Sequence, residues 1–469
     1  MIKRKEKIYY SIGATSNGVK TDAFTYFLLF FYSNLIGLSP GLASLVIFLA
    51  LVIDAVSDPI VGIISDRTNH QLGRRHPFFL IGLIPMTFSY FFLFSIQQSW
   101  EFSQMHIFLW MLTFTVFTRL GMTLFDVPHR SFGGELSNSY SERTNIFAWR
   151  ELFLVAGGLT NAFLAYSVFF RNNTQFKNGL LNPEPWIYYG LTGSLIMLAS
   201  VLITYYGTLK KSKDVNKFHY SFTIRQIFNQ ILNAFRTKSF ILFFLGYLFI
   251  ALSWGLSSSL QLYVTTFFWE FDTSKLTFFI PIYASASVLA FYILSLVSNI
   301  FEKRTLILFA LSVASIMHAI PVPLALLGYL PSLGSWNLFF ATAPFLLVTS
   351  TCLVASAIIR ESMLGDISDE VELSSGLGQQ GLMYASSSFI GKLNTGFGIL
   401  LSGLILEFIN FPQGSEIPPT ASQIINLALT QGPLVSILMF IPFIIFYFYP
   451  ISRSKHKEIL NKLKKQKTY

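Results

Sequence analysis

Apolar stretches of about 20 residues recur along this 469-residue chain, and they restrict its fold more than any other feature. Each is long enough to cross a hydrocarbon core of roughly 30 Å as a helix. Within lipid, backbone groups must satisfy their own hydrogen bonds, and these stretches lack the polar–apolar alternation of barrel strands. We predict an all-α integral membrane protein with about twelve spans, at residues 10–37, 41–65, 77–97, 104–133, 146–170, 186–208, 239–268, 275–300, 304–329, 336–364, 378–409 and 423–451.

The distribution of charge supports this interpretation. Only 12% of the residues are charged, against roughly 25% in soluble domains. Most Lys and Arg residues lie at the N-terminus, in alternate loops and in the C-terminal tail, which is the positive-inside pattern. This distribution predicts a multi-pass plasma (inner) membrane protein with both termini cytoplasmic. The net charge of +10 therefore does not indicate a nucleic-acid-binding protein.

The longest loop divides the chain into two sets of six spans. We predict an N-terminal half at 1–208, a basic cytoplasmic loop at 209–238, a C-terminal half at 239–451 and a basic cytoplasmic tail at 452–469. Two six-helix halves joined in this way are typical of the major facilitator fold, in which substrates bind near the midplane between the halves.

Three aspartates lie inside predicted spans, where a charge costs roughly 2.5–3.5 kcal/mol. Asp54 and Asp58 share one helix face, and two close carboxylates repel unless a cation lies between them. Sodium prefers oxygen ligands, so these two side chains, with Asp126 and the Thr123 hydroxyl, predict a sodium site. A proton-carrying carboxyl and a purely structural ion pair with a buried arginine are the alternatives.

Basic residues also fall at membrane depth. Arg119, Asp126 and Arg130 are spaced so that one helix face can carry all three, and an arginine beside an aspartate often only neutralises it. Such cations suit ligands that bear hydroxyl or carboxylate groups. The other charged residues predicted within spans are Lys20 with Asp22, Arg150, Arg360 and Lys392.

Charged segments at the predicted cytoplasmic ends are candidates for gating. Asp66 and Arg67 end the second span, and Arg74 and Arg75 follow in a tight loop, so charge pairs there would break as the halves rock. A plain positive-inside loop is the alternative. An acidic stretch at 366–372 follows the tenth predicted span and is expected to pair with basic loops in one state.

Several motifs resemble those of the glycoside–pentoside–hexuronide:cation symporters, a melibiose permease-like family of the major facilitator superfamily. The match covers nearly the whole chain in order. Its motifs are Asp54-Ala-Val-Ser-Asp58-Pro-Ile-Val-Gly62, Asp66-Arg67-Thr68, Gly73-Arg74-Arg75-His76-Pro77, Asp126-Val-Pro128, Glu135-Leu136, Glu142-Arg143-Thr144, Arg150, Gly365-Asp366, Gly381-Leu-Met-Tyr384 and Gly391-Lys392.

The resemblance implies roles for individual residues. The family's cation-binding carboxylates match Asp54 and Asp58, with Thr123 and Asp126 contributing from the fourth helix, and Asp126 would also contact the sugar. Arg150 matches a sugar-binding arginine. The other residues assigned on this basis are Lys392, Arg130, Lys20, Asp22 and Tyr384 for substrate, and Asp66, Arg67, Arg74, Arg75, Asp366 and Arg143 for gating.

The chain departs from the melibiose-type pattern at the sugar pocket. Asn17 and Gly18 replace a Lys-Asp pair, Arg130 replaces a tryptophan, and another tryptophan aligns near Ala357. These changes favour a sugar acid or a larger glycoside over a galactoside.

We therefore predict a secondary active transporter that couples sodium, or alternatively proton, flow to uptake of a sugar, glycoside or sugar acid. A lysophospholipid carrier of the same fold and a non-transporting sensor are the alternatives. The sequence contains no HExxH motif, no GxSxG motif and no histidine cluster, so we do not expect an enzyme. We expect no cofactor besides the transported cation, and as partners the sugar, that cation and the bilayer; the oligomeric state stays open, with a monomer as one option.

Overall fold

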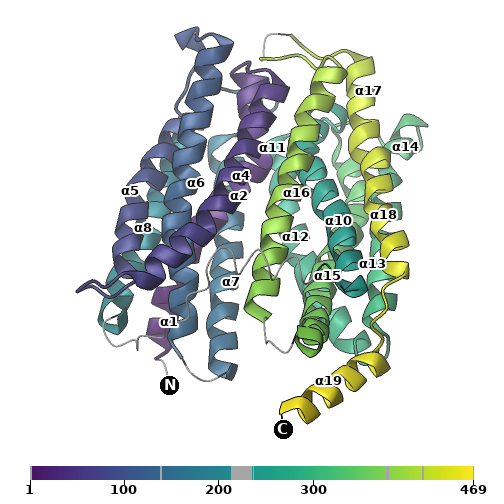
Figure 1. Ribbon diagram of the computed structural model, residues 1–469. Helices are drawn as coiled ribbons and strands as arrows, with labels where there is room; N and C mark the ends of the chain where they lie inside the picture. Colours follow the sequence, from purple (N-terminus) through teal and green to yellow (C-terminus); the bar gives the residue numbers. More distant parts are fainter. Residues whose placement is uncertain are drawn as a thin grey trace. The chain divides into compact units, whose positions relative to one another are not determined.

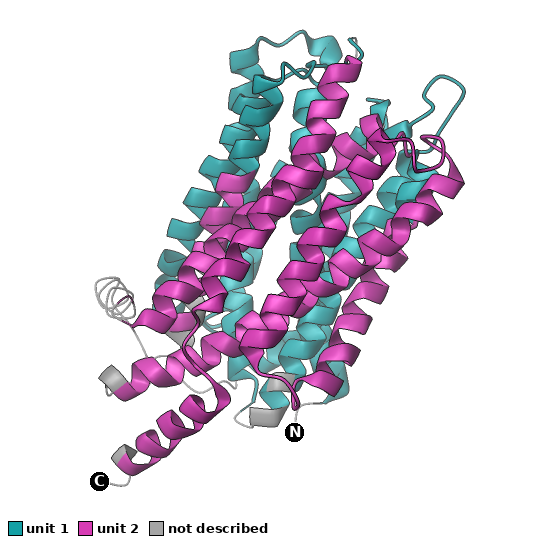
Figure 2. Cartoon of the chain, turned by 90° about the vertical axis from the view of Figure 1, so that its right-hand side faces the viewer, with its two compact units in different colours: residues 1–222, 272–277, 399–419 teal, residues 223–271, 278–398, 420–469 magenta. Residues whose placement is uncertain are grey.

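The chain folds entirely into helices and connecting segments over the part that the computed structural model describes, residues 3–137, 140–212, 235, 237–375, 380–414 and 417–467 (Figure 1). Contacts divide it into two compact units (Figure 2). Unit 1 comprises Met1–Phe222, Asp272–Thr277 and Ile399–Pro419, and unit 2 comprises Thr223–Phe271, Phe278–Gly398 and Thr420–Tyr469. The division into residues 1–208, 209–238, 239–451 and 452–469 stays a prediction, and within its loop 213–234 and 236 lie outside the described residues.

Eleven helices among the described residues are long and apolar enough to cross a membrane, and they match the last eleven predicted spans. The first predicted span, 10–37, differs because it is divided into shorter pieces. These are α1 (Arg4–Ile12), α2 (Ala14–Asp22), the π-helix η1 (Ala23–Phe27), α3 (Leu28–Phe30) and the π-helix η2 (Phe31–Leu35). A count of twelve spanning helices is thus not fully confirmed.

Unit 1 contains the pieces of the first span and, among the described residues, five long helices of the N-terminal half. The remaining elements of unit 1 are α4 (Pro40–Arg67), α5 (His76–Leu93), η3 (Gln98–Trp100), α6 (Gln104–Glu135), α7 (Tyr140–Leu164), η4 (Ala165–Phe169), η5 (Gly179–Leu181), α8 (Trp186–Ser212), α11 (Thr273–Thr277) and the last turns of α16 (Gln380–Phe408).

Glycines allow two helix pairs of unit 1 to pack closely. A Cβ at Gly18 of α2 would lie 2.0 Å from the Leu154 carbonyl oxygen of α7, and one at Gly82 of α5 would lie 2.4 Å from the Gly121 carbonyl oxygen of α6. Small residues permit this approach between membrane helices. The first contact holds the charged end of α2 against α7.

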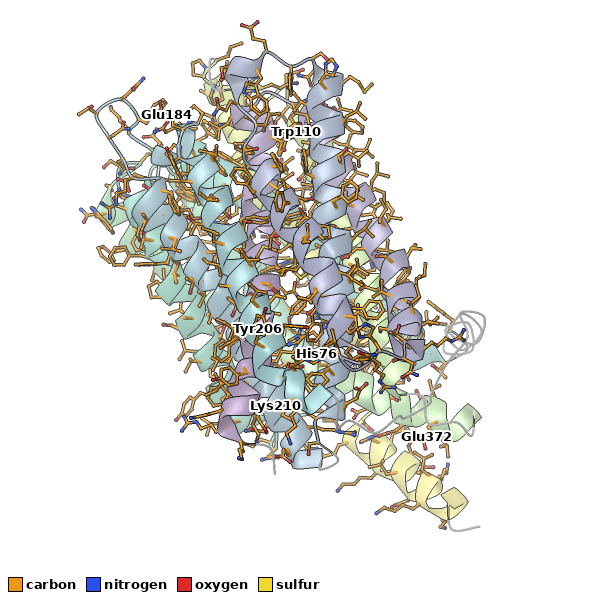
Figure 3. The ribbon with its side chains drawn as sticks, turned by 90° about the vertical axis from the view of Figure 1, so that its left-hand side faces the viewer. His76, Trp110, Glu184, Tyr206, Lys210 and Glu372 are labelled. Carbon is orange, nitrogen blue, oxygen red and sulfur yellow. The ribbon has the colours of Figure 1, made fainter. Side chains whose placement is uncertain are left out.

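The two ends of unit 1 differ in their side chains. Figure 3 shows Trp110 and Glu184 toward one end of the unit and His76, Tyr206 and Lys210 toward the other. His76 is fully buried, and its Nε2 lies 2.8 Å from the Thr208 hydroxyl. The predicted cytoplasmic end is therefore tied together by a buried polar contact between α5 and α8.

Unit 2 packs its long helices around a core that includes Phe240, Leu311, Met363 and Phe446. Its elements are α10 (Lys238–Tyr263), η6 (Val264–Phe268), α12 (Phe279–Val297), α13 (Lys303–Ala319), α14 (Pro321–Leu326), α15 (Trp336–Ser375), α16 up to residue 398, α17 (Ala421–Leu429), η7 (Thr430–Leu434), α18 (Val435–Tyr447) and α19 (Arg453–Lys467).

The acidic stretch 366–372 follows the predicted span 336–364 as part of the same helix, α15. The helix continues because Met363, Leu364, Ile367 and Val371 present a buried apolar face to the core. Its carboxylates have basic partners: Asp366 accepts from Lys303 at 2.7 Å, Glu370 lies 3.3 Å from Lys455, and Asp369 lies 2.9 Å from His456. The tail helix α19 thus docks on the end of α15.

Candidate cation and substrate sites

Two carboxylates of α4 converge on one hydroxyl of α6. The Thr123 Oγ1 lies 2.8 Å from Asp54 Oδ1 and 2.9 Å from Asp58 Oδ1. Asp54 and Thr123 are buried, and Asp58 is half-buried. Because the hydroxyl has one proton, it can donate fully to only one carboxylate at a time. The Asp54 and Asp58 carboxylate oxygens therefore share the single hydroxyl proton of Thr123.

Arg119 balances part of the charge in this group. Its guanidinium lies 3.2 Å from Asp54 Oδ2, on the carboxylate oxygen that Thr123 does not contact, and stacks 5.0 Å from the centre of the Phe24 ring. Asp54 therefore has one cationic and one neutral hydrogen-bond partner, Arg119 and Thr123.

A proline in α4 removes the usual helical donor of one backbone carbonyl. Pro59 follows Asp58 directly and has no N–H to donate to the carbonyl of Ala55, four residues earlier. Ala55 directly follows Asp54 and lies three residues before Asp58, and its carbonyl oxygen is a hard ligand of the type that sodium prefers.

Asp126 lies in a different charge group of unit 1. Its Oδ1 accepts from Arg150 at 2.7 Å, and its Oδ2 lies 2.7 Å from Arg130. Arg150 of α7 is 2% exposed at its side chain and also donates to Glu151 at 2.5 Å, whereas the Arg130 side chain is 50% exposed. Arg150 is therefore the more fully desolvated of the two arginines.

The expected group of three aspartates does not come together. Within the described residues, no set of three His, Cys, Asp or Glu side chains is close enough to hold a metal ion. Asp126 contacts Arg130 and Arg150, while Asp54 contacts Thr123 and Arg119 and Asp58 contacts Thr123. The sequence predicted Thr123 beside Asp54 and Asp58 and Arg130 on the face of Asp126, but not the contacts of Arg119 with Asp54 and of Arg150 with Asp126, because these are fixed by helix packing.

The first-span pair Lys20 and Asp22 also lies in unit 1. Asp22 accepts from Asn161 of α7 at 2.9 Å, and the same Asn161 amide nitrogen lies 2.7 Å from the Tyr189 hydroxyl of α8. Lys20 contributes to the electrostatic environment of Asp126. Asn161 was not singled out from the sequence, although a lone amide within an apolar span was a usable signal.

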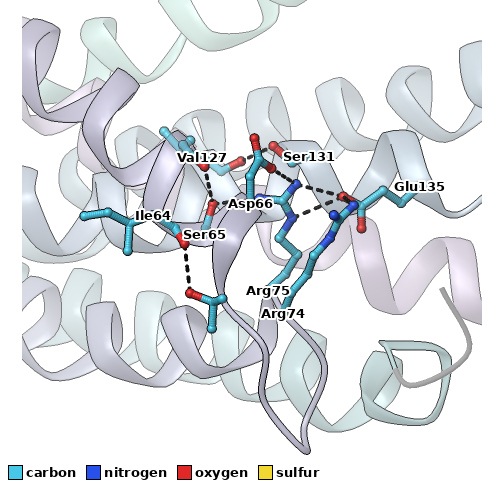
Figure 4. Close-up of polar contacts among 10 residues, drawn as sticks. Ile64, Ser65, Asp66, Arg74, Arg75, Val127, Ser131 and Glu135 are labelled. Atoms are coloured by element: carbon cyan, nitrogen blue, oxygen red, sulfur yellow. Dashed lines mark hydrogen bonds and ion pairs between the residues drawn. The ribbon is translucent and has the colours of Figure 1, made fainter. Parts of the chain in front are cut away.

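Three of the predicted gating residues, Asp66, Arg74 and Arg75, form a charge cluster with Glu135 at the end of α4 (Figure 4). Arg75 forms an ion pair with Asp66 and donates to Ser65 at 2.7 Å and to Glu135 at 2.8 Å. Arg74 contacts the same Glu135 carboxylate at 2.5 Å. This cluster joins α4, the loop before α5 and the end of α6 through charge-assisted hydrogen bonds.

The other assigned residues are more dispersed. Arg143 donates to the Ser137 carbonyl at 2.5 Å, and Arg67 is exposed at the last position of α4. In unit 2, Lys392 of α16 is half-buried, and Arg360 lies 4.0 Å from the centre of the Tyr247 ring. The side chain of Tyr384 lies outside the described residues.

A long-helix architecture with two clusters of buried charge defines a multi-pass membrane transporter, and comparison with known proteins specifies the family. The sequence profile described as MFS/sugar transport protein matches residues 9–453. The chain therefore belongs to this family of the major facilitator superfamily, whose members are transporters and not enzymes.

Two relatives and one solved structure illustrate the range of similarity. The glucuronide carrier protein homolog of Escherichia coli is 21% identical, over 98% of this chain and 95% of its own length. The mouse sodium-dependent lysophosphatidylcholine symporter 1 is 21% identical, over 96% of this chain and 86% of its own. The inward-open xylose transporter XylE of E. coli shares the fold, with a TM-score of 0.59 and 11% identity, over 98% of this chain and 97% of its own.

Proposed function

We propose that this transporter couples sodium entry to uptake of a sugar acid or glycoside by alternating access. The observation that carries the proposal is the convergence of the Asp54 and Asp58 carboxylates on the Thr123 hydroxyl, at 2.8 and 2.9 Å. A structural ion pair needs only an arginine beside each carboxylate, whereas here both carboxylates also meet at one neutral hydroxyl.

The cation site consists of Asp54, Asp58 and Thr123, with the Ala55 carbonyl as an additional ligand. All four groups supply oxygen, so a hard cation that prefers oxygen ligands, such as sodium, fits best. Sodium is favoured over a proton because two carboxylates and neutral oxygens form a cage, while a proton needs only one acceptor. Asp126 belongs to the substrate side of this proposal.

The substrate site is centred on Asp126 and Arg150, with Arg130 and Lys20 nearby. Arg150 and Arg130 both contact the buried Asp126, and Arg150 also pairs with the exposed Glu151. Arginine presents a planar fork that suits carboxylate and paired hydroxyl groups. A sugar acid would satisfy both features, and the similarity to a glucuronide carrier homolog supports this class.

Coupling follows from the arrangement on α6. Thr123 belongs to the cation group and Asp126, three residues later, belongs to the substrate group, so both occupy nearly one face of the same helix. A cation that fixes Thr123 also restricts this turn of α6. Linkage requires that the substrate raise cation affinity by the same factor.

Gating and topology complete the proposal. The termini lie in the cytoplasm, and the cluster of Arg75, Asp66 and Glu135 holds the cytoplasmic ends of α4 and α6 in one state and opens in the other. Arg74, Arg143 and the Lys303–Asp366 pair take part at the same side. Lys392 and Tyr384 contribute to the substrate from the C-terminal half.

A lysophospholipid is the second candidate substrate. The similarity to a sodium-dependent lysophosphatidylcholine symporter favours it. The concentration of buried charge around Asp126 opposes it, because an acyl chain would gain nothing from these groups and would leave them desolvated.

Uptake into proteoliposomes tests the proposal. We would measure radiolabelled glucuronate, methyl glucuronide, glucose and lysophosphatidylcholine with an inward sodium gradient, with a pH gradient and with neither. Sodium-stimulated accumulation of an acid or glycoside is the expected result. Accumulation only with the pH gradient would reject sodium coupling, and transport of the lipid alone would reject the substrate class.

A further inference from the structure

Unit 2 contains a cavity of about 80 Å³ that the proposed function does not use. It is lined by residues of α10, η6, α12, α13, α14, α15 and η7, all within unit 2. A buried water needs about 10–15 Å³ of such volume, so the cavity has room for roughly five to eight water molecules. It is therefore larger than an ordinary packing defect.

The lining residues combine aromatic rings with neutral hydrogen-bonding groups. None of the described residues that line the cavity is Asp, Glu, Lys or Arg. Trp269, Phe271, Phe279 and Phe339 supply ring surfaces, and the Phe279 and Phe339 rings stack at 6.0 Å. The polar side chains lining the cavity are Gln261, Thr265, His318, Thr342, Thr349 and Gln431.

One of these polar groups is buried without a partner. Thr349 is 4% exposed, and among the described residues its hydroxyl has no hydrogen-bond partner. Most helical threonines in lipid donate to a carbonyl of the preceding turn, as Thr351 does to Leu347 at 2.8 Å. An unpaired buried hydroxyl costs about 1–3 kcal/mol, so a ligand that accepts its proton would remove a real penalty.

The two glutamines are also incompletely bonded among the described residues. Within that part of the chain, the Gln431 side-chain nitrogen reaches only Ser257 at 3.4 Å and Gln261 at 3.5 Å, both at the limit of a hydrogen bond. Meanwhile the Gln431 backbone carbonyl accepts from His318 at 2.7 Å, which fixes its position. The amides are therefore held in place with hydrogen-bonding capacity left over.

Both π-helical segments that the structure describes in unit 2 contribute to this cavity. Thr265 belongs to η6, Trp269 follows it directly, and Gln431 belongs to η7. Single π-turns interrupt α-helices rarely and occur frequently at functional sites. Two independent interruptions at one cavity indicate that the helices are shaped around it.

We propose that this cavity binds a neutral polyhydroxylated molecule no larger than one monosaccharide. The amides and the Thr349 hydroxyl match several hydroxyl groups, and an aromatic face attracts the slightly positive C–H face of a sugar ring. A charged ligand would find no counter-ion there. The site goes beyond the proposed function, because it uses none of the unit 1 residues and needs no cation.

Equilibrium dialysis of the full-length protein in lipid nanodiscs tests this inference. The probes are radiolabelled glycerol, xylose and glucose, without sodium, with glucuronate and lysophosphatidylcholine as competitors. We expect saturable binding of at least one neutral probe. Thr349→Val and Gln431→Met should each weaken it about 5- to 10-fold, while the matched variant Thr351→Val, whose hydroxyl bonds within its own helix, should stay within about twofold of the wild type.

Three results would overturn the inference: no saturable binding of any neutral probe, equal binding by all variants, or displacement by lysophosphatidylcholine or glucuronate but not by unlabelled xylose. The outcome is separable from that of the proposed function. Sodium-driven uptake without neutral binding would reject only the cavity, and neutral binding without sodium-driven uptake would reject only the symport.

Discussion

The polar groups of unit 1 are charged and tightly paired, whereas those that line the cavity of unit 2 are neutral and incompletely bonded. In unit 1, Arg150 and Asp126 meet at 2.7 Å, and Asp54 meets Arg119 and Thr123 at 3.2 and 2.8 Å. In unit 2, the Gln431 amide reaches its partners only at 3.4 and 3.5 Å.

This difference assigns different tasks to the two regions. Buried charges interact strongly over several ångströms and change a site's net charge when one is lost, so they suit ion binding and coupling. Neutral amides and aromatic rings distinguish ligands by their shape and by the number of their hydroxyl groups. Ligand binding by such groups depends little on the ionic strength. The comparison predicts large effects for charge substitutions in unit 1 and small ones for equivalent changes at the periphery of unit 2.

The largest effect is expected for Asp58→Asn. The substitution keeps the shape but removes one of the two carboxylate charges of the cation group, so apparent sodium affinity should fall about 100-fold or more, on the order of 2.7 kcal/mol. Sodium dependence of substrate uptake in proteoliposomes measures it. Ser57→Ala is the control, because that hydroxyl already donates to the Asp54 carbonyl at 3.2 Å. Normal sodium stimulation in Asp58→Asn would remove Asp58 from the site.

A second test compares the two arginines that hold Asp126. Arg150→Lys should weaken uptake of a sugar acid about 30-fold, because the planar fork of a buried guanidinium is lost. Arg130→Lys should cost no more than about fivefold, since its side chain is 50% exposed and water screens it. Competition by unlabelled glucuronate measures both. An equal loss of uptake in the two variants would mean that burial does not determine how much each arginine contributes to substrate binding.

A smaller effect is expected for the charge cluster at the end of α4. Arg75→Gln removes contacts to Asp66, Ser65 and Glu135 and should favour the state in which this end is open. The expected shift is about 1–3 kcal/mol, which lowers the transport rate without abolishing cation binding. Accessibility of a cysteine placed at Thr68 to a membrane-impermeant maleimide reports opening. Unchanged labelling with unchanged transport would assign the cluster to stability alone.

The sequence predicted the membrane helices well and the contacts between them less well. Spans 2 to 12 follow from apolar length alone, since nothing else satisfies the backbone in lipid. The sequence did not predict the π-turns that interrupt the first span. It also did not predict that the acidic stretch 366–372 is helical, which follows from the buried face that Met363 and Val371 present to the core.

The same distinction holds for the sites. A charge within an apolar run is conspicuous, so Asp54, Asp58, Asp126 and Arg150 were found from the sequence. Thr349 and Gln431 are neutral residues of ordinary kinds within spans, and only the cavity and the unpaired hydroxyl distinguish them. Resemblance to a family supplied roles but not partners, which is why Asp126 was expected beside the other two aspartates.

The smallest effect is expected where unit 2 carries charge at its periphery. Lys455 of α19 lies 3.3 Å from Glu370, but its side chain is 42% exposed. Such pairs contribute about 0–1 kcal/mol, because water screens both charges and ordering the long side chain costs entropy. Lys455→Gln should therefore leave uptake unchanged and lower the thermal unfolding temperature by no more than about 2 °C. Docking of α19 also rests on the buried Ile459 and Leu463, so Ile459→Asp is expected to release it where Lys455→Gln does not. A large loss of uptake in Lys455→Gln would show that charge governs unit 2 as well, and the contrast between the two regions would fail.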